Sequence, residues 1–129
     1  MQQSDWRGVF AAITTPFTEG GSVDHGFLRD HIAWLLDNGV KGIVALGSLG
    51  EAPTLTADEK RSVLRLAQAG VADRVPLVAG ISALSTAEAM TLARDAEEIG
   101  CDGLMVLPPY VYRGDWRETA EHIQSILSA

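Results

Sequence analysis

The feature that most constrains the fold of this chain is a unit that occurs four times along it. Each unit is a short, almost continuous apolar run followed by a longer stretch in which apolar residues have helical spacing. The runs lack the strict alternation of a strand with one face in water and are typical of strands covered on both faces, as in parallel sheets. We therefore expect strands within residues 8–17, 42–47, 76–82 and 103–109.

The stretches after these runs have the pattern of amphipathic helices, with apolar residues three or four positions apart. Capping-box spacing marks two helix starts: Thr56 with Glu59 and Ser85 with Glu88. Glycines stand where the helical patterns stop: Gly39, Gly70 and Gly100. The sequence thus predicts helices over residues 24–38, 57–70, 86–99 and from 115 to the end. We expect the tryptophans to pack under or between these helices: Trp6, Trp34 and Trp116.

Strand–helix–strand units with short connections build parallel sheets with right-handed crossovers. Two α/β architectures fit this pattern: an open doubly wound sheet, and a parallel (βα)4 half of a (β/α)8 barrel. A complete barrel typically needs about 250 residues, whereas this chain has 129 in one segment, residues 1–129, without linkers or low-complexity tracts. Length alone therefore favours the open sheet.

The balance of charges argues against several classes of function. The chain has 17 acidic residues and 10 basic ones, which do not cluster, and a formal net charge of −7. It therefore lacks the basic surface that nucleic acids require. No apolar stretch approaches the roughly 20 residues that span a bilayer, and the first residues do not have the order of a signal peptide. The lone cysteine, Cys101, forms no internal disulfide, so we expect a cytoplasmic protein.

In both architectures ligands bind at the carboxyl ends of the strands. The most informative strand exit reads Gly47-Ser48-Leu49-Gly50-Glu51. Two glycines flank a hydroxyl there, so backbone N–H groups can turn toward a small anion such as a carboxylate, with the Ser48 hydroxyl as a further donor. The alternative is a plain turn. We expect Glu51 to orient this turn by accepting backbone donors rather than to act as an acid.

Other polar side chains have simpler interpretations. Thr14 and Thr15 end the first run, and their hydroxyls either bond other groups of the site or cap the strand exit. Cys101 has no histidine near it in the sequence and is expected to be a structural thiol. Three histidines lie on predicted helices and are expected at the surface: His25, His31 and His122. They have no metal-ligand spacing, so we expect no metal.

Taken in chain order, four segments carry a resemblance to a known family: ITTPF, GSLGEAPTLT with the following Glu-Lys helix start, VAGIS and LPPYVY. Together they resemble the dihydrodipicolinate synthase/N-acetylneuraminate lyase family of pyruvate-dependent class I aldolases, from about residue 8 to the end. The resemblance implies a (β/α)8 barrel, which reverses the preference from length. It also implies a homo-oligomer that forms a Schiff base between a lysine and pyruvate or another 2-oxo acid, without a cofactor.

The resemblance implies roles for individual residues. Ser48 takes the hydroxyl position of the family's GTTGE or GSTGE motif, which relays protons and holds the 2-oxo acid carboxylate. The expected binding site also includes Thr15, Gly47, Leu49, Gly50 and Glu51. Leu49 departs from the motif because family members that bind pyruvate commonly have a second hydroxyl there.

The tyrosine that several family members contribute to the neighbouring subunit's proton relay falls at Val111, which has no hydroxyl. Tyr110 and Tyr112 flank that position. They either supply the catalytic phenol or pack at a subunit interface.

A Schiff-base enzyme needs a lysine amine aimed into the site, and this chain has two lysines. Lys41 precedes the second strand, at the end opposite the catalytic loops, and Lys60 lies on the first turn of an outer helix. Neither is expected to reach a substrate. In the family, the Schiff-base lysine and the main relay tyrosine come from later strands, so the chain resembles the N-terminal half of such an enzyme.

Three candidate functions are consistent with this sequence to different degrees. The first is the N-terminal part of a Schiff-base lyase that acts on a small 2-oxo acid. The second is a non-catalytic half barrel that binds small carboxylates or serves in assembly. The third, an open flavodoxin-like module, is weakest because the strand exits have neither the acidic residues of a receiver domain nor a long glycine-rich phosphate loop.

Overall fold

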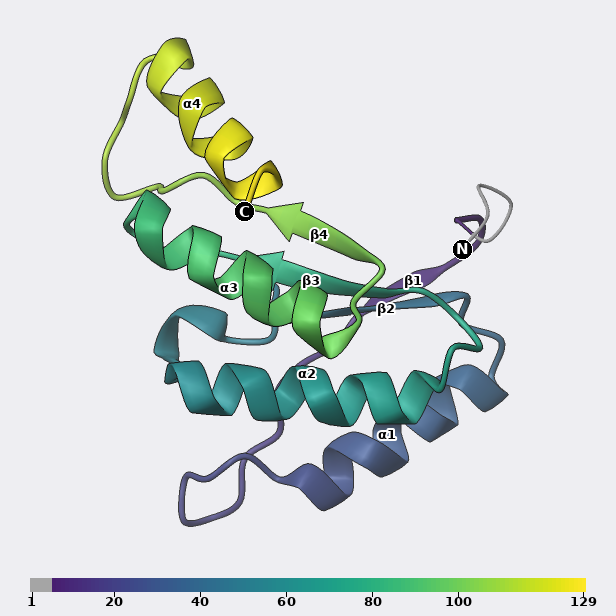
Figure 1. Ribbon diagram of the computed structural model, residues 1–129. Helices are drawn as coiled ribbons and strands as arrows, with labels where there is room; N and C mark the ends of the chain where they lie inside the picture. Colours follow the sequence, from purple (N-terminus) through teal and green to yellow (C-terminus); the bar gives the residue numbers. More distant parts are fainter. Residues whose placement is uncertain (1–5) are drawn as a thin grey trace.

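The computed structural model describes residues 6–129, in which strands and helices alternate along the chain (Figure 1). The strands are β1 (Phe10–Ala12), β2 (Gly42–Ala45), β3 (Leu77–Ile81) and β4 (Gly103–Val106). The helices are α1 (His25–Asp37), α2 (Ala57–Val71), α3 (Thr86–Ile99) and α4 (Trp116–Leu127), with a short 3-10 turn, η2 (Ala52–Thr54), before α2. The four predicted strand–helix units are therefore confirmed, although each strand is shorter than its apolar run.

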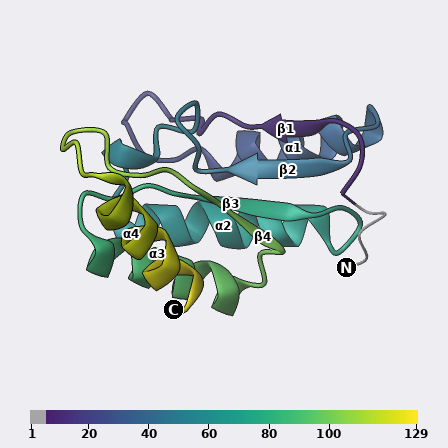
Figure 2. The same cartoon turned by 90° about the horizontal axis from the view of Figure 1, so that it is seen from above.

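All the strand pairs are parallel, and the strands lie in the order β1-β2-β3-β4, as the view from above shows (Figure 2). An open doubly wound sheet changes direction partway across, which places helices on both of its faces. Here every crossover moves the same way, so successive helices pack side by side along the sheet. The structure is a (βα)4 half of a (β/α)8 barrel, and the expectation of an open sheet from length was wrong.

The core lies between the sheet and the helices. Ile43 of β2 and Leu77 of β3 are fully buried there, in one cluster with Leu28 and Ile32 of α1. Because side chains alternate along a strand, the neighbouring positions point to the other face of the sheet. That inner face carries five side chains that are not part of the core cluster: Phe10, Ala12, Val44, Val78 and Met105.

The glycine stops are confirmed at two helices and wrong at the third. Gly39 and Gly100 follow α1 and α3 with φ of +88° and +92°, in the left-handed region that ends a helix. Gly70 instead lies inside α2, which continues to Val71. A Cβ on Gly70 would lie 3.0 Å from Cγ2 of Ile32. This glycine therefore allows close packing of α1 on α2 rather than ending a helix.

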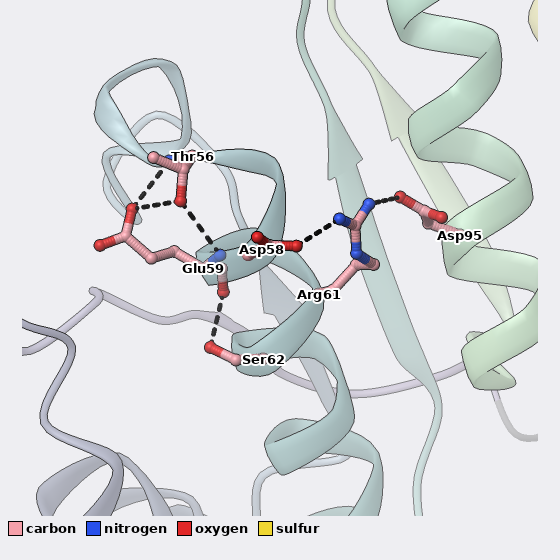
Figure 3. Close-up of polar contacts among 6 residues, drawn as sticks. All are labelled: Thr56, Asp58, Glu59, Arg61, Ser62 and Asp95. Carbon is pink, nitrogen blue, oxygen red and sulfur yellow. Dashed lines mark hydrogen bonds and ion pairs between the residues drawn. The ribbon is translucent and has the colours of Figure 1, made fainter.

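The start of α2 is fixed by two sets of polar contacts (Figure 3). In the capping box, the Thr56 N–H donates to Glu59 Oε2 (2.8 Å) and the Glu59 N–H donates to Thr56 Oγ1 (3.3 Å). Arg61 donates to Asp58 on the same helix and, through Nη1, to Oδ2 of Asp95 on α3 (2.9 Å). Asp58 and Asp95 raise the pKa of the Arg61 guanidinium. These contacts fasten the helix that follows the β2 strand exit.

The capping box predicts an acid-sensitive contribution to stability. The Thr56 N–H, and then its hydroxyl, lower the pKa of Glu59 below its ordinary value of 4.5. The contribution is therefore complete above about pH 4.5 and disappears as the pH falls through the lower folded value. The free energy of unfolding of the native chain should exceed that of Glu59→Gln at pH 7, and urea titrations should show this gap closing as the pH is lowered below 4.5. A gap that stays the same from pH 7 into the acid range would contradict the prediction.

The tryptophans do not pack under or between helices as expected. Trp34 on α1 and Trp116 on α4 are 60% and 78% exposed. Trp6 stacks on Phe10 with ring centroids 5.7 Å apart, over the inner face of the sheet. Within residues 6–129, the sides of α1 and α4 that carry Trp34 and Trp116 have little cover.

The histidines also differ from one another. His25 is exposed, as expected, and its Nε2 lies 3.2 Å from Oγ of Ser62. His31 is half-buried between the rings of Phe27 and Trp34. The expectation of a surface position was wrong for His122, which is 7% exposed because it faces α3, where its Nδ1 lies 2.9 Å from Oγ1 of Thr86.

Candidate functional site

The strand β2 runs directly into a tight turn at the carboxyl end of the sheet, residues 46–51, which we name the Ser48 turn. Leu46 and Glu51 bracket it with φ of 61° and 54°, in the left-handed region that non-glycine residues rarely adopt. Each such residue costs about 1–3 kcal/mol, and this kind of strain is concentrated at functional sites. Inside the turn, the Gly50 N–H donates to the Gly47 carbonyl (2.9 Å) and the Glu51 N–H to the Ser48 carbonyl (3.2 Å).

This internal bonding leaves the tip of the turn with hydrogen-bond donors to offer. Ser48 and Leu49 are exposed, whereas Gly47 and Gly50 are buried. Within residues 6–129, the N–H groups of Ser48 and Leu49 donate no hydrogen bond. With the Ser48 hydroxyl they form a cluster of donors of the kind that suits a small carboxylate.

Thr15, from the segment after β1, contacts the turn directly. Its Oγ1 donates to the Gly50 carbonyl at 2.7 Å, and the residue is only 5% exposed. Of the two alternatives for this hydroxyl, the structure shows the bond to another group of the candidate site. Thr14 is exposed.

Glu51 acts on the turn through its backbone. Its carbonyl accepts the Thr54 N–H (2.9 Å) and the Thr54 hydroxyl (2.8 Å), which builds η2. The Glu51 carboxylate makes no capping bond to η2. The orientation expected from the carboxylate therefore comes, in the described part of the chain, from the main chain of the same residue.

Lys60 lies on the predicted helix, but its burial was not expected. It is on the first turn of α2, yet its side chain is 7% exposed. It lines a cavity of about 240 Å³ at the exits of β3 and β4, together with Ser82, Glu88 and Tyr110. The predicted place on the first turn of α2 is therefore confirmed, whereas the burial of Lys60 at this cavity was not predicted. The residues that line this cavity do not include Ser48 or Leu49.

Lys41 lies where it was expected. It is exposed and precedes β2, at the end of the strands opposite the Ser48 turn. The two tyrosines are 74% and 70% exposed, with Val111 between them 56% exposed. Tyr110 lines the Lys60 cavity, whereas Tyr112 lines a second cavity of about 190 Å³ with Thr86 and His122. The two tyrosines thus line different cavities.

Gly80 is a residue of the candidate site that was not predicted from the sequence. It is the last residue but one of β3 and lies against the Ser48 turn: a Cβ there would lie 2.6 Å from the Leu46 carbonyl carbon and 2.9 Å from the Gly47 nitrogen. A glycine inside a strand pattern is itself a signal of close backbone approach.

Two further features bear on chemistry. Cys101 is half-buried, and burial, followed by the charge of Asp102, raises its pKa to about 11. Its thiol therefore stays protonated and unreactive near neutral pH, which fits a structural thiol.

Within residues 6–129 we find no group of three His, Cys, Asp or Glu side chains placed to hold a metal ion. The helices of the same region are too short or too polar to cross a membrane.

The chain matches the model of the dihydrodipicolinate synthetase family over residues 5–129. The 4-hydroxy-tetrahydrodipicolinate synthase of Moorella thermoacetica is 39% identical over 124 residues, which are 96% of this chain and 42% of the relative. The chain thus spans less than half the length of the curated relatives it matches.

Solved structures show the same relation. The chain superposes on YagE, a prophage protein of Escherichia coli K12 solved with pyruvate, with a TM-score of 0.91 and 28% identity, over 95% of this chain and 41% of that one. The N-acetylneuraminate lyase of Mycoplasma synoviae gives a TM-score of 0.92 at 31% identity, over 99% of this chain and 45% of that one.

Proposed function

The chain belongs to the dihydrodipicolinate synthetase family, and from this premise we propose that it is the N-terminal part of a Schiff-base-forming lyase. In this proposal the Ser48 turn binds the carboxylate of pyruvate or a related 2-oxo acid. The observation that carries the proposal is the donor cluster at a parallel strand exit, formed by the N–H groups of Ser48 and Leu49 and the Ser48 hydroxyl. The binding of pyruvate by YagE supports the choice of ligand.

Each part of the turn has a separate task in this proposal. The two N–H groups hold the carboxylate, and the glycines on either side keep the backbone open for it. The Ser48 hydroxyl donates to the bound acid and passes protons to and from it. Tyr110 or Tyr112 supplies the phenol that Val111 lacks, within the site or to a neighbouring subunit. Leu49 contributes its N–H but no hydroxyl, so the rest of the substrate meets an apolar side chain there.

Catalysis in this proposal needs an amine from outside the segment. Lys41 precedes β2, at the end of the strands opposite the Ser48 turn, and Lys60 lines a cavity that Ser48 does not line. This separation also favours the second candidate function, a non-catalytic half barrel that binds small carboxylates or serves in assembly. The presence of a strand-terminal lysine downstream in the coding sequence separates the two candidates.

Binding at the turn is tested by nuclear magnetic resonance on the isotopically labelled chain. Pyruvate should shift the amide resonances of Ser48 and Leu49, whereas the neutral pyruvamide should not, because it lacks the carboxylate charge. Ser82→Ala, at the next strand exit, is the matched control and should respond like the native chain. Equal shifts with pyruvate and pyruvamide, or shifts confined to other residues, would refute carboxylate binding by this turn.

The 129-residue chain by itself should form no covalent adduct with pyruvate. A Schiff base requires a deprotonated amine beside the bound carbonyl, and neither lysine is placed there. After incubation with pyruvate and borohydride, the intact mass should be unchanged. A stoichiometric reduced adduct would contradict the prediction, and the Lys60→Arg variant would then show whether the amine in the 240 Å³ cavity had reacted.

A further inference from the structure

We infer that Thr15 and Gly80 are positioning residues, which together hold the Ser48 turn in its left-handed conformation and keep its two N–H groups in place for a carboxylate. This inference rests on the proposed function for what the turn binds. The positioning role rests on two features that involve no ligand. One is the buried hydrogen bond from Thr15 to the Gly50 carbonyl, and the other is the absence of a Cβ at Gly80, which lets β3 approach the turn.

The turn needs to be held because its own bonds leave it strained. Two non-glycine residues, Leu46 and Glu51, adopt left-handed backbone angles only five positions apart. Inside the turn, the bonds at Gly50 and Glu51 are single main-chain contacts of 2.9 and 3.2 Å near an exposed tip. A strained conformation persists only when the surrounding structure determines it. The surroundings of the turn should therefore contain the groups that impose it.

Thr15 supplies the first of these groups. Its hydroxyl reaches from the β1 side, 35 residues away in sequence, to the Gly50 carbonyl at 2.7 Å. Since the residue is 5% exposed, water offers little replacement for this bond. The Gly50 position is equally confined, because a Cβ there would lie 3.2 Å from both the Ile13 carbonyl oxygen and the Leu46 nitrogen.

Gly80 imposes the conformation in a second way, because it has no Cβ and so lets the turn lie against β3. On β3 it faces the start of the turn, where an added Cβ would collide with the Leu46 carbonyl and lie 2.9 Å from the Gly47 nitrogen. The next strand also approaches the turn, since a Cβ on Gly47 would lie 3.2 Å from Cε of Met105 on β4. The turn after β2 thus contacts groups from β3, β4 and the segment after β1, and its exposed residues are the Ser48–Leu49 tip and Glu51.

The test compares Thr15→Val, which keeps the shape but removes the hydroxyl, with Thr15→Ser, which keeps the hydroxyl. Amide hydrogen exchange of the ligand-free chain reports the turn directly. In Thr15→Val, exchange at Gly50 and Glu51 should rise about tenfold, because the Gly50 carbonyl loses its buried donor. Exchange at Ile43, whose N–H donates to the Pro76 carbonyl (2.9 Å), should not change. Thr15→Ser should resemble the native chain at both places.

A second pair of measurements separates this inference from the proposed function. The pyruvate dissociation constant should rise about tenfold in Thr15→Val and stay unchanged in Thr15→Ser. Gly80→Ala should accelerate exchange at Gly50 and Glu51 in the same way. If the native chain binds no pyruvate but the exchange pattern is as expected, the proposed function fails and the positioning role of Thr15 stands.

Two results would overturn the positioning role. One is unchanged exchange at Gly50 and Glu51 in Thr15→Val. The other is an equal acceleration at these residues and at Ile43, since Thr15 would then contribute only to the stability of the whole sheet. Both results come from Thr15→Val, so a failure of Gly80→Ala to fold would not prevent the decision.

Discussion

In a protein that carries this segment within a complete barrel, replacement of Ser48 by alanine is expected to lower turnover about 10²–10⁴-fold, the range typical of a lost proton-transfer group. The backbone of the Ser48 turn does not depend on the hydroxyl, since its internal bonds run from Gly50 to Gly47 and from Glu51 to Ser48 through main-chain atoms. Substrate affinity should therefore fall much less than turnover.

Steady-state kinetics measure this effect, with two variants as controls. Ser48→Thr retains the hydroxyl and should keep most of the turnover. Ser82→Ala removes a serine at the neighbouring strand exit, on the Lys60 cavity rather than on the turn, and should have a small effect. Similar and mild losses in Ser48→Ala and Ser82→Ala would show that Ser48 serves only the geometry of the turn.

The second large effect concerns association. The 129-residue chain on its own is expected to self-associate or to be poorly soluble, because in the described residues β1 and β4 each have one strand neighbour and open backbone groups on the other side. The inner face of the sheet adds apolar side chains, of which Met105 is 37% exposed, and Trp116 on α4 is 78% exposed. Two copies have the eight strands of one barrel, which would pair both edges.

Light scattering at micromolar concentration measures this association. Met105→Lys places a charge on the β4 edge and should reduce the apparent mass, as lysines do on natural edge strands. Thr91→Lys adds the same charge on the exposed side of α3 and should leave the mass unchanged. A compact, stable monomer of the native chain would contradict the prediction and imply that the strand edges are covered.

Local pattern was enough to predict the elements. The helix over residues 86–99 has the predicted bounds, because its capping serine, its apolar spacing and its closing glycine are all properties of neighbouring residues. The prediction failed at Gly70, where the reason for a glycine is not local. It lies in Ile32 of another helix, whose side chain occupies the space that a Cβ would take.

For the candidate site, too, the local features were predictable and the packing was not. The motif around Ser48 identified the turn and its donors, because glycines and a hydroxyl at a strand exit are visible in the sequence. The burial of Lys60 and the separation of Tyr110 from Tyr112 were not, since amphipathic spacing says which side of a helix is apolar but not what packs on it.

By itself, then, the sequence determined the order of strands and helices, the approximate bounds of the helices, the family resemblance and the turn that carries the candidate chemistry. Only the tertiary structure decided the strand order that makes a half barrel, and the contacts that hold the turn, from Thr15 to Gly50 and from Gly80 to Leu46. The physical reason is separation along the chain. Helix caps and periodicity act over a few residues, whereas the groups around the Ser48 turn come from strands that meet only after the crossovers have closed.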